Sequence, residues 1–380
     1  MPASSHSILS CSSAERYIQC PPSVRLSEQF ENKSSTFSEE GSVAHELAER
    51  KLLKAFGVTE SYEPVDSHWV NQEMEEHTNS YVSYIMEIVK EIKDKGQDYI
   101  ALVEQRVDLS DYAPECYGTA DSIIYAIDNE GKGKLYLTDL KYGVGVRVES
   151  RMNAQLMLYA LGALTIMDNL IDIDEIEMCI FQPRIGNISS FLMKKEDLLD
   201  WAEKVFKVQA KLAYEGKGDF KVGSHCRWCL CKQICKKRAE YNLELAKMEF
   251  KEPGLLTNEE IGMVLDKAEA LASWAEDVKS YAFKEALSGH AIPGYKLVEG
   301  RSTRKYSDEV KVSSILINAG YDPFEKKLMG ITTLTKLIGK NKFVELVEPY
   351  IVKPAGKPTL VKEDDPRPEF NNAINDFKDE

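Results

Sequence analysis

A carboxylate and a lysine spaced two residues apart, Asp139 and Lys141, close a segment of β-strand character in LTDLK. Side chains alternate along a strand, so we expect these two to share one face. A second carboxylate, Asp121, lies at the start of the preceding strand-like run. Carboxylates are hard ligands suited to Mg²⁺ or Mn²⁺, and a neighbouring ammonium can orient or deprotonate a water or offset charge on a phosphate. These residue types favour metal-assisted hydrolysis, although an isolated D-x-K also fits the solvated face of an edge strand.

A β-hairpin and the helix after it would position these residues. Two β-patterned runs, 120–127 and 134–140, flank a turn rich in Asn, Gly and Lys at 128–133, which is the pattern of a hairpin. The helix that follows carries Gln155 and Tyr159, four residues apart and therefore on one face. The polar residues thus fall within one compact unit of the chain.

Further elements surround this unit on both sides in the sequence. Amphipathic or apolar patterning predicts helices at 41–56, 70–95 and 194–214 and strands at 99–109, 176–183 and 189–193. The order of these elements predicts an α/β fold with a mixed central sheet flanked by helices.

Composition is typical of a soluble globular protein, with 43% apolar and 29% charged residues among 380. Apolar runs fall short of the roughly 18 residues that cross a bilayer, and no secretory signal opens the chain, so we expect a cytoplasmic protein with no membrane contact.

The net charge of −14 argues against broad, non-specific binding of nucleic acid. A local basic channel or bound divalent cations would still allow contact with phosphates.

Four of the eight cysteines lie within ten positions near residue 230. In a cytosolic chain this density indicates a metal site rather than disulfides. Cys226, Cys229 and Cys235 form C-x2-C-x5-C, Cys231 is in excess, and a fourth thiolate must come from elsewhere. Zinc and an iron–sulfur cluster both take such ligands, and the spacing alone leaves both open.

GTAD, LTDLK and Q-x-x-x-Y together resemble the RecB-type branch of the PD-(D/E)XK nuclease superfamily, which includes the AddB and CRISPR-associated exonucleases. The resemblance covers about residues 7–238 and implies a restriction-endonuclease-like core that hydrolyses DNA, more as an exonuclease than an endonuclease. It implies that Asp121 and Asp139 bind Mg²⁺ or Mn²⁺ and that Lys141 positions the attacking water. Gln155 and Tyr159 would then hold the DNA strand or the lysine.

Two more residues match motifs of that branch. His45, in a G-x-x-x-H-E segment, resembles the first motif, whose histidine lies at the metal site. Glu104 matches an acidic residue on the strand before the metal-binding aspartate. The resemblance therefore implies that both complete or orient the metal shell.

The cysteine spacing resembles the C-terminal triad of AddB-like nucleases, whose fourth cluster ligand comes from an N-terminal arm. The resemblance implies a [4Fe–4S] cluster on Cys20, Cys226, Cys229 and Cys235, with Zn²⁺ as the alternative. Cys11 is an alternative fourth ligand, and Cys231 is an alternative within the downstream group.

The resemblance does not reach the last third of the chain. We expect a nuclease domain over 1–250, a mainly helical domain over 251–352 and a flexible acidic tail over 353–380. This arrangement resembles an uncharacterised phage-borne family of such nucleases, which implies action in recombination or replication in a bacterial host's cytoplasm. A phage single-strand-binding or annealing protein would be a partner.

Two other functions compete with the exonuclease. A non-catalytic DNA- or protein-binding accessory on a nuclease scaffold fits the acidic charge and the unassigned C-terminal third. The intact set of Asp121, Asp139 and Lys141 argues for the enzyme, and a zinc structural protein would leave Gln155, Tyr159 and His45 unexplained. Polarity, strand preference and oligomeric state stay open.

Overall fold

The computed structural model describes residues 7–30, 36–58, 65–167, 170–245, 258–298, 307–318, 320, 323–324 and 329–351. The chain divides into two units, Met1–Val298 and Glu299–Glu380, which are described separately. The boundary expected near residue 250 and the tail expected over 353–380 lie outside the described residues, so the predicted division into three parts stays a prediction.

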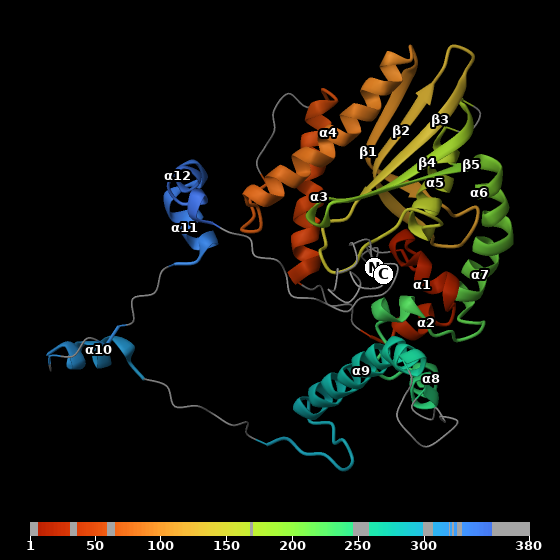
Figure 1. The fold of residues 1–380 in the computed structure, drawn as a ribbon. Helices are drawn as coiled ribbons and strands as arrows, with labels where there is room; N and C mark the ends of the chain where they lie inside the picture. Colours follow the sequence, from red (N-terminus) through yellow and green to blue (C-terminus); the bar gives the residue numbers. More distant parts are fainter. Residues whose placement is uncertain are drawn as a thin grey trace, which may run out of the picture. The chain divides into compact units, whose positions relative to one another are not determined.

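A five-stranded mixed sheet, in the order β1-β2-β3-β4-β5, forms the centre of the first unit (Figure 1). Its strands are β1 (Asp98–Asp108), β2 (Tyr117–Ile127), β3 (Lys132–Leu140), β4 (Asp172–Gln182) and β5 (Asn187–Lys194). Neighbouring strands are antiparallel except β3 and β4, which are parallel and are joined through the crossover helix α5 (Ala154–Ile166). The mixed α/β architecture is confirmed, and so is the predicted hairpin, since β2 and β3 pair directly.

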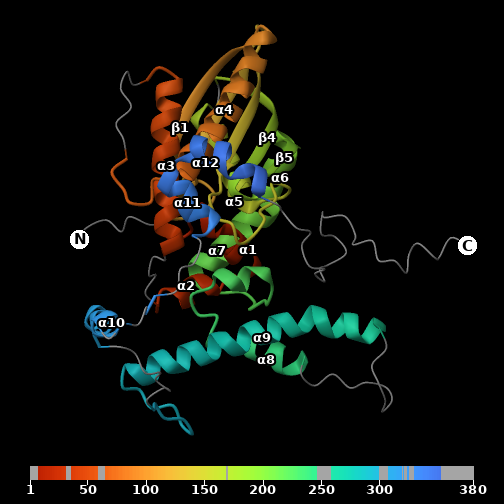
Figure 2. The same ribbon diagram turned by 60° about the vertical axis from the view of Figure 1, so that its left-hand side comes forward.

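Helices cover both faces of the sheet (Figures 1 and 2). Ile124 and Ala126 of β2 pack in one cluster with α3 and α4, whereas Ile123 and Tyr125 pack in another with α5, α6, α7 and α1. This separation follows from the alternation of side chains along the strand. The bounds are α1 (Ala14–Gln19), α2 (Ser23–Ser27), α3 (Thr36–Ala55), α4 (Gln72–Asp94), α6 (Lys195–Trp201) and α7 (Lys207–Glu215).

The predicted helices at 70–95 and 194–214 are present with small differences. In α4, the N-cap Asn71 side chain accepts a hydrogen bond from the Met74 amide at 3.0 Å, and the buried side chains recur every three to four residues. The second helix is interrupted between α6 and α7 by a π-helical segment, Ala202–Phe206.

After α7 the chain forms a short 3₁₀ turn (Ser224–Trp228), α8 (Lys236–Leu245) and α9 (Asn258–Leu287). Asp277 of α9 accepts a hydrogen bond from Arg238 at 2.7 Å and pairs with Lys232 at 3.2 Å, which fixes α9 to the cysteine-rich segment. The second unit contains α10 (Glu309–Asn318), α11 (Ile331–Ile338) and α12 (Lys340–Leu346). Over the described residues, no helix combines the length and apolar character that crossing a membrane requires.

Candidate metal centre

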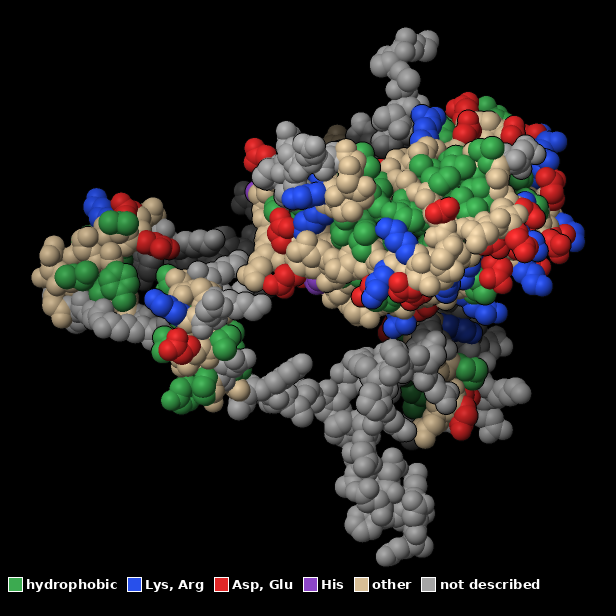
Figure 3. Space-filling view, turned by 90° about the horizontal axis from the view of Figure 1, so that it is seen from above, with side chains coloured by type: hydrophobic (Ala, Val, Ile, Leu, Met, Phe, Trp, Pro, Cys, Tyr) green, Lys and Arg blue, Asp and Glu red, His purple; other side chains and the backbone are tan. Residues whose placement is uncertain are grey.

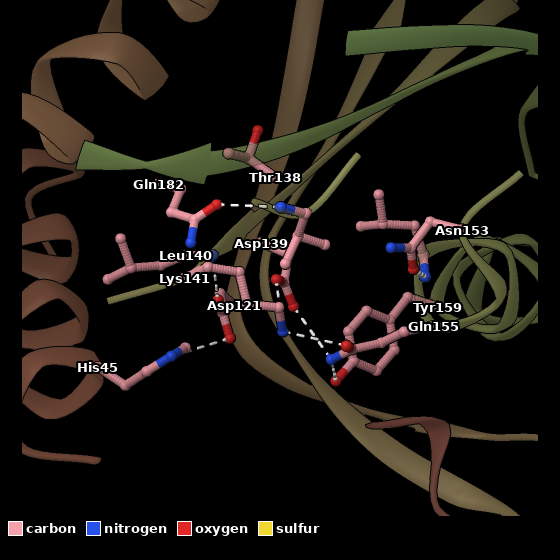
Figure 4. Close-up of polar contacts among 12 residues, drawn as sticks. His45, Asp121, Thr138, Asp139, Leu140, Lys141, Asn153, Gln155, Tyr159 and Gln182 are labelled. Atoms are coloured by element: carbon pink, nitrogen blue, oxygen red, sulfur yellow. Dashed lines mark hydrogen bonds and ion pairs between the residues drawn. The ribbon is translucent and has the colours of Figure 1, made fainter. Parts of the chain in front are cut away.

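The site lies where β2 and β3 separate. Their pairing ends at Ser122 and Thr138; beyond it, β2 continues beside β1 and β3 continues beside β4. Asp121 and Asp139 are the next residues of the two strands, and the Leu140 amide donates to Asp121 Oδ2 across the gap at 2.6 Å. This fork brings the two carboxylates into one place (Figure 4).

Three potential ligands converge on one side of the fork. His45 Nδ1, from α3, lies 3.3 Å from Asp121 Oδ1 and 4.0 Å from Glu104 Oε1 of β1. One ligand atom from each residue lies within 4.8 Å of the others. Two carboxylates and an imidazole at this spacing could hold a divalent cation.

The backbone of Glu104 is strained. Its φ of 46° lies in the left-handed region, which costs a non-glycine residue about 1–3 kcal/mol. The β1–β2 pairs on either side are Val103 with Ser122 and Gln105 with Ala120, so Glu104 lies opposite Asp121 at a break in the ladder. The fold tolerates this strain at the position that brings the Glu104 carboxylate to His45 and Asp121.

The pKa values indicate a site that favours positive charge. Burial disfavours the imidazolium, yet the carboxylates of Asp121 and Asp139 raise the pKa of His45 to about 9. Burial and the charge of Asp121 raise the pKa of Glu104 to about 7. The pKa of Asp121 is lowered in spite of its burial, mainly by the neighbouring His45. A divalent cation could supply the positive charge that the proton on His45 otherwise provides.

On the other side of the fork, four side chains form a closed network (Figure 4). Lys141 Nζ lies 2.8 Å from Asp139 Oδ2 and donates to Gln155 Oε1 at 3.0 Å. Gln155 Nε2 contacts Asp139 Oδ1 at 3.1 Å and the Tyr159 hydroxyl at 2.9 Å. The expectation that Asp139 and Lys141 share a face is confirmed, as is the expectation for Gln155 and Tyr159.

The network keeps Lys141 charged. Burial opposes the ammonium, but the adjacent Asp139 carboxylate raises the pKa of Lys141 above its usual value. Burial and the charge of Asp121 raise the pKa of Asp139, in spite of its pairing with Lys141. Of the three roles expected for the lysine, orienting a water and offsetting phosphate charge suit this charged state better than deprotonating a water.

The structure therefore brings together potential ligand atoms of His45, Glu104 and Asp121. Asp139 instead contacts Lys141 and Gln155. A hollow of about 180 Å³, counted out to open solvent, lies beside the ligand group and is also lined by Glu49 and Tyr81. Glu49 was not predicted. It follows His45 by four residues on α3, a spacing that places both on one face of a helix and could have identified it.

Five cysteines, from the two ends of the α/β region, line a second cavity. Cys20 joins Cys226, Cys229, Cys231 and Cys235 around a hollow of about 340 Å³, counted out to open solvent. Cys229 Sγ and Cys231 Sγ are 3.3 Å apart. The hydrogen bond with Cys231 lowers the pKa of Cys229 to about 6 against the effect of burial, which favours the thiolate that binds metals.

The alternative fourth ligand, Cys11, lies elsewhere. It is buried in the core beside Cys116, whose thiol raises the pKa of Cys11. Of the two N-terminal candidates, Cys20 is thus the one that lines the cysteine cavity.

Comparison with known proteins identifies a similar solved structure and a matching family model. A solved structure described as "Crystal structure of SSO0001" is similar at 12% identity over 60% of this chain and 85% of that chain, with a TM-score of 0.28, too low to carry an argument. Residues 6–368 match the family model described as "Protein of unknown function (DUF2800)". Because this match spans nearly the whole sequence, the chain belongs to the DUF2800 family.

Proposed function

We propose that this chain is a Mg²⁺- or Mn²⁺-dependent deoxyribonuclease with a PD-(D/E)XK core, acting as an exonuclease. The observation that carries the proposal is the fork, where a ligand group of His45, Glu104 and Asp121 lies beside a charged Lys141. The resemblance of GTAD, LTDLK and Q-x-x-x-Y to RecB-type nucleases supports the same assignment.

His45, Glu104 and Asp121 would hold the divalent ion, because carboxylate oxygens and an imidazole suit Mg²⁺ or Mn²⁺. When bound, the ion supplies a Lewis acid that stabilises charge developing on the phosphate. Asp139 is the further ligand proposed from the resemblance. Its oxygens contact Lys141 and Gln155, so it would have to exchange one of these contacts.

Lys141 would donate to a phosphate oxygen or to the attacking water. Its ammonium is oriented by Asp139 and Gln155, and Gln155 is in turn fixed by the Tyr159 hydroxyl. Such preorganised donors stabilise charge in a transition state without reorganising during the reaction.

For the cysteine cavity we propose a [4Fe–4S] cluster on Cys20, Cys226, Cys229 and Cys235. Thiols in this arrangement suit zinc as well as an iron–sulfur cluster. The choice of the cluster rests on the resemblance of the cysteine spacing to that of AddB-like nucleases. The cluster would fasten the N-terminal arm to the segment after α7.

The test uses protein purified without oxygen and end-labelled linear DNA with Mn²⁺ or Mg²⁺. Lys141→Ala and Asp139→Ala should abolish degradation. Lys134→Ala is the matched control, since Lys134 also lies on β3 and pairs with a carboxylate, Glu177, at 2.8 Å. Its activity should equal that of the wild type.

Metal-dependent degradation that persists in both site variants would refute the assignment of these residues. No degradation by the wild type with its cluster intact would favour the non-catalytic DNA- or protein-binding accessory.

The proposed setting is phage recombination or replication in a bacterial cytoplasm, with a phage single-strand-binding or annealing protein as partner.

A further inference from the structure

The loop 142–153 begins and ends at the candidate centre. It connects Lys141 to Gln155, and the hydrogen bond between these two side chains, 3.0 Å long, closes the loop at its base. A ligand bound at Lys141 therefore lies at the foot of this loop.

Two buried amides from the neighbouring strands hold the backbone of the loop. Gln182 Nε2 donates to the carbonyls of Gly143 at 2.9 Å and Val146 at 2.8 Å, and Gln182 Oε1 accepts from the Val148 amide at 3.2 Å. Asn187 Nδ2 donates to the Val148 carbonyl at 2.8 Å. These contacts use the main chain of the loop at Gly143, Val146 and Val148, and the side chains of Val144 and Val146 take no part in them.

Three of the loop's side chains are apolar and exposed, namely Val144, Val146 and Met152. Scattered apolar residues on a surface need no explanation, but these three share one anchored loop beside the site. Met152 also has a left-handed backbone, with φ of 53°, at a cost of about 1–3 kcal/mol for a non-glycine residue. The anchoring and the strain both hold apolar groups in water next to the centre.

Two of the cations near the loop have acidic partners, whereas Arg151, within the loop, lies over the Phe191 ring at 5.4 Å from its centroid. Arg147 pairs with Glu149 at 2.6 Å, and Arg184 pairs with Glu40 at 3.1 Å. Basic and acidic side chains are likewise interspersed on the face seen from above (Figure 3). With a net charge of −14, this arrangement favours contacts to bases over contacts to a long run of phosphates.

We propose that Val144, Val146 and Met152 form a base-contacting surface for unpaired nucleotides of the DNA strand whose phosphate lies at Lys141. The inference rests on the proposed nuclease function and specifies its substrate as a single-stranded or frayed end. In an intact duplex the faces of the bases are covered by stacking, and an apolar side chain reaches them only by opening the stack at a cost of a few kcal/mol. Unpaired bases offer their faces without that cost.

The test compares Val144→Ser/Val146→Ser with Val205→Ser/Val208→Ser. The pairs are matched in type and exposure: Val144 and Val146 are 49% and 36% exposed, and Val208 and Val205 are 50% and 37% exposed. Fluorescence anisotropy would measure the binding of a labelled single strand and of a blunt duplex of the same sequence, in Ca²⁺ and at several salt concentrations.

We expect the wild type and the control to prefer the single strand. The loop variant should bind the single strand about tenfold more weakly, with unchanged duplex affinity and an unchanged dependence on salt, because the lost contacts are apolar. An unaltered preference, or an equal loss for both DNAs, would overturn the inference.

Degradation assays in Mn²⁺ distinguish a failure of this inference from a failure of the proposed nuclease function. A wild type that degrades DNA, together with a loop variant that keeps the wild-type preference, would remove only the base-contacting surface. A wild type that neither binds nor degrades DNA would remove the proposed function, and the inference with it.

Discussion

Replacing Lys141 with methionine should destabilise the metal-free protein. The Asp139 side chain is only 2% exposed and lies 2.8 Å from the Lys141 ammonium, whose side chain is 27% exposed. The substitution leaves a buried carboxylate with the Gln155 amide as donor and Asp121 close by. Removing one partner of a buried ion pair costs about 3–5 kcal/mol; because water reaches part of this pair, we expect about 2–4 kcal/mol.

Lys134→Met is a control that differs chiefly in its partner. Lys134 is also 27% exposed and also lies 2.8 Å from a carboxylate, but that carboxylate, on Glu177, is 33% exposed. Pairs of this kind contribute less than about 1 kcal/mol. The difference between the two variants therefore reports the burial of Asp139.

Urea denaturation of the metal-free protein near pH 8, compared at equal slopes, measures both costs. In an Asp139→Asn background, Lys141→Met should cost less than it does in the wild type, because the carboxylate that the ammonium contacts is gone and only the more distant interaction with Asp121 is lost. Without its lysine, Asp139 should have a folded pKa further above its unfolded value, so the penalty should shrink as the pH falls through that folded pKa and the carboxyl takes up a proton. Equal losses from Lys141→Met and Lys134→Met, or full additivity in the double variant, would refute the reasoning.

Three other predictions concern the ligands. The affinity for Mn²⁺ should rise from about pH 6 to about pH 9, because Glu104 and His45 must lose protons to bind the ion and have pKa values of about 7 and 9. Calorimetry should detect the released protons, and an affinity that does not depend on pH would contradict the prediction. Glu104→Gly should raise the free energy of unfolding by about 1 kcal/mol by relieving the left-handed backbone, while weakening Mn²⁺ binding in a titration; a less stable variant would argue against strain. Cys20→Ser should lose its iron in metal analysis whereas Cys11→Ser keeps it, and the reverse result would make Cys11 the ligand.

The sequence predicts the parts of this fold that depend on local periodicity. Alternation along a strand was sufficient to place Asp139 and Lys141 on one face, and the helical repeat was sufficient for Gln155 and Tyr159. Both relations hold over a few residues, where backbone geometry leaves little choice. The mixed sheet also follows from the order of strands and helices.

The ligand group could not be derived in the same way. Glu104 faces Asp121 because of the register between β1 and β2, and His45 joins them through the packing of α3, so both depend on contacts between residues distant in the sequence. The positive φ of Glu104 runs against the preference of its residue type and has no sequence signal. Cys20 was preferred to Cys11 only through the resemblance, and the packing places Cys20 at the cysteine cavity and Cys11 in the core.

Charge illustrates the same distinction between the whole chain and the site. The net charge of −14 describes the entire surface, whereas binding of a phosphate depends on the few charges at the fork. With His45 protonated, three carboxylates there face two cations; a divalent ion in place of that proton would balance the charges. Under the proposed function, this acidic protein would accept a phosphate at the site once the ion is bound, and contact between DNA and the fork should require the metal.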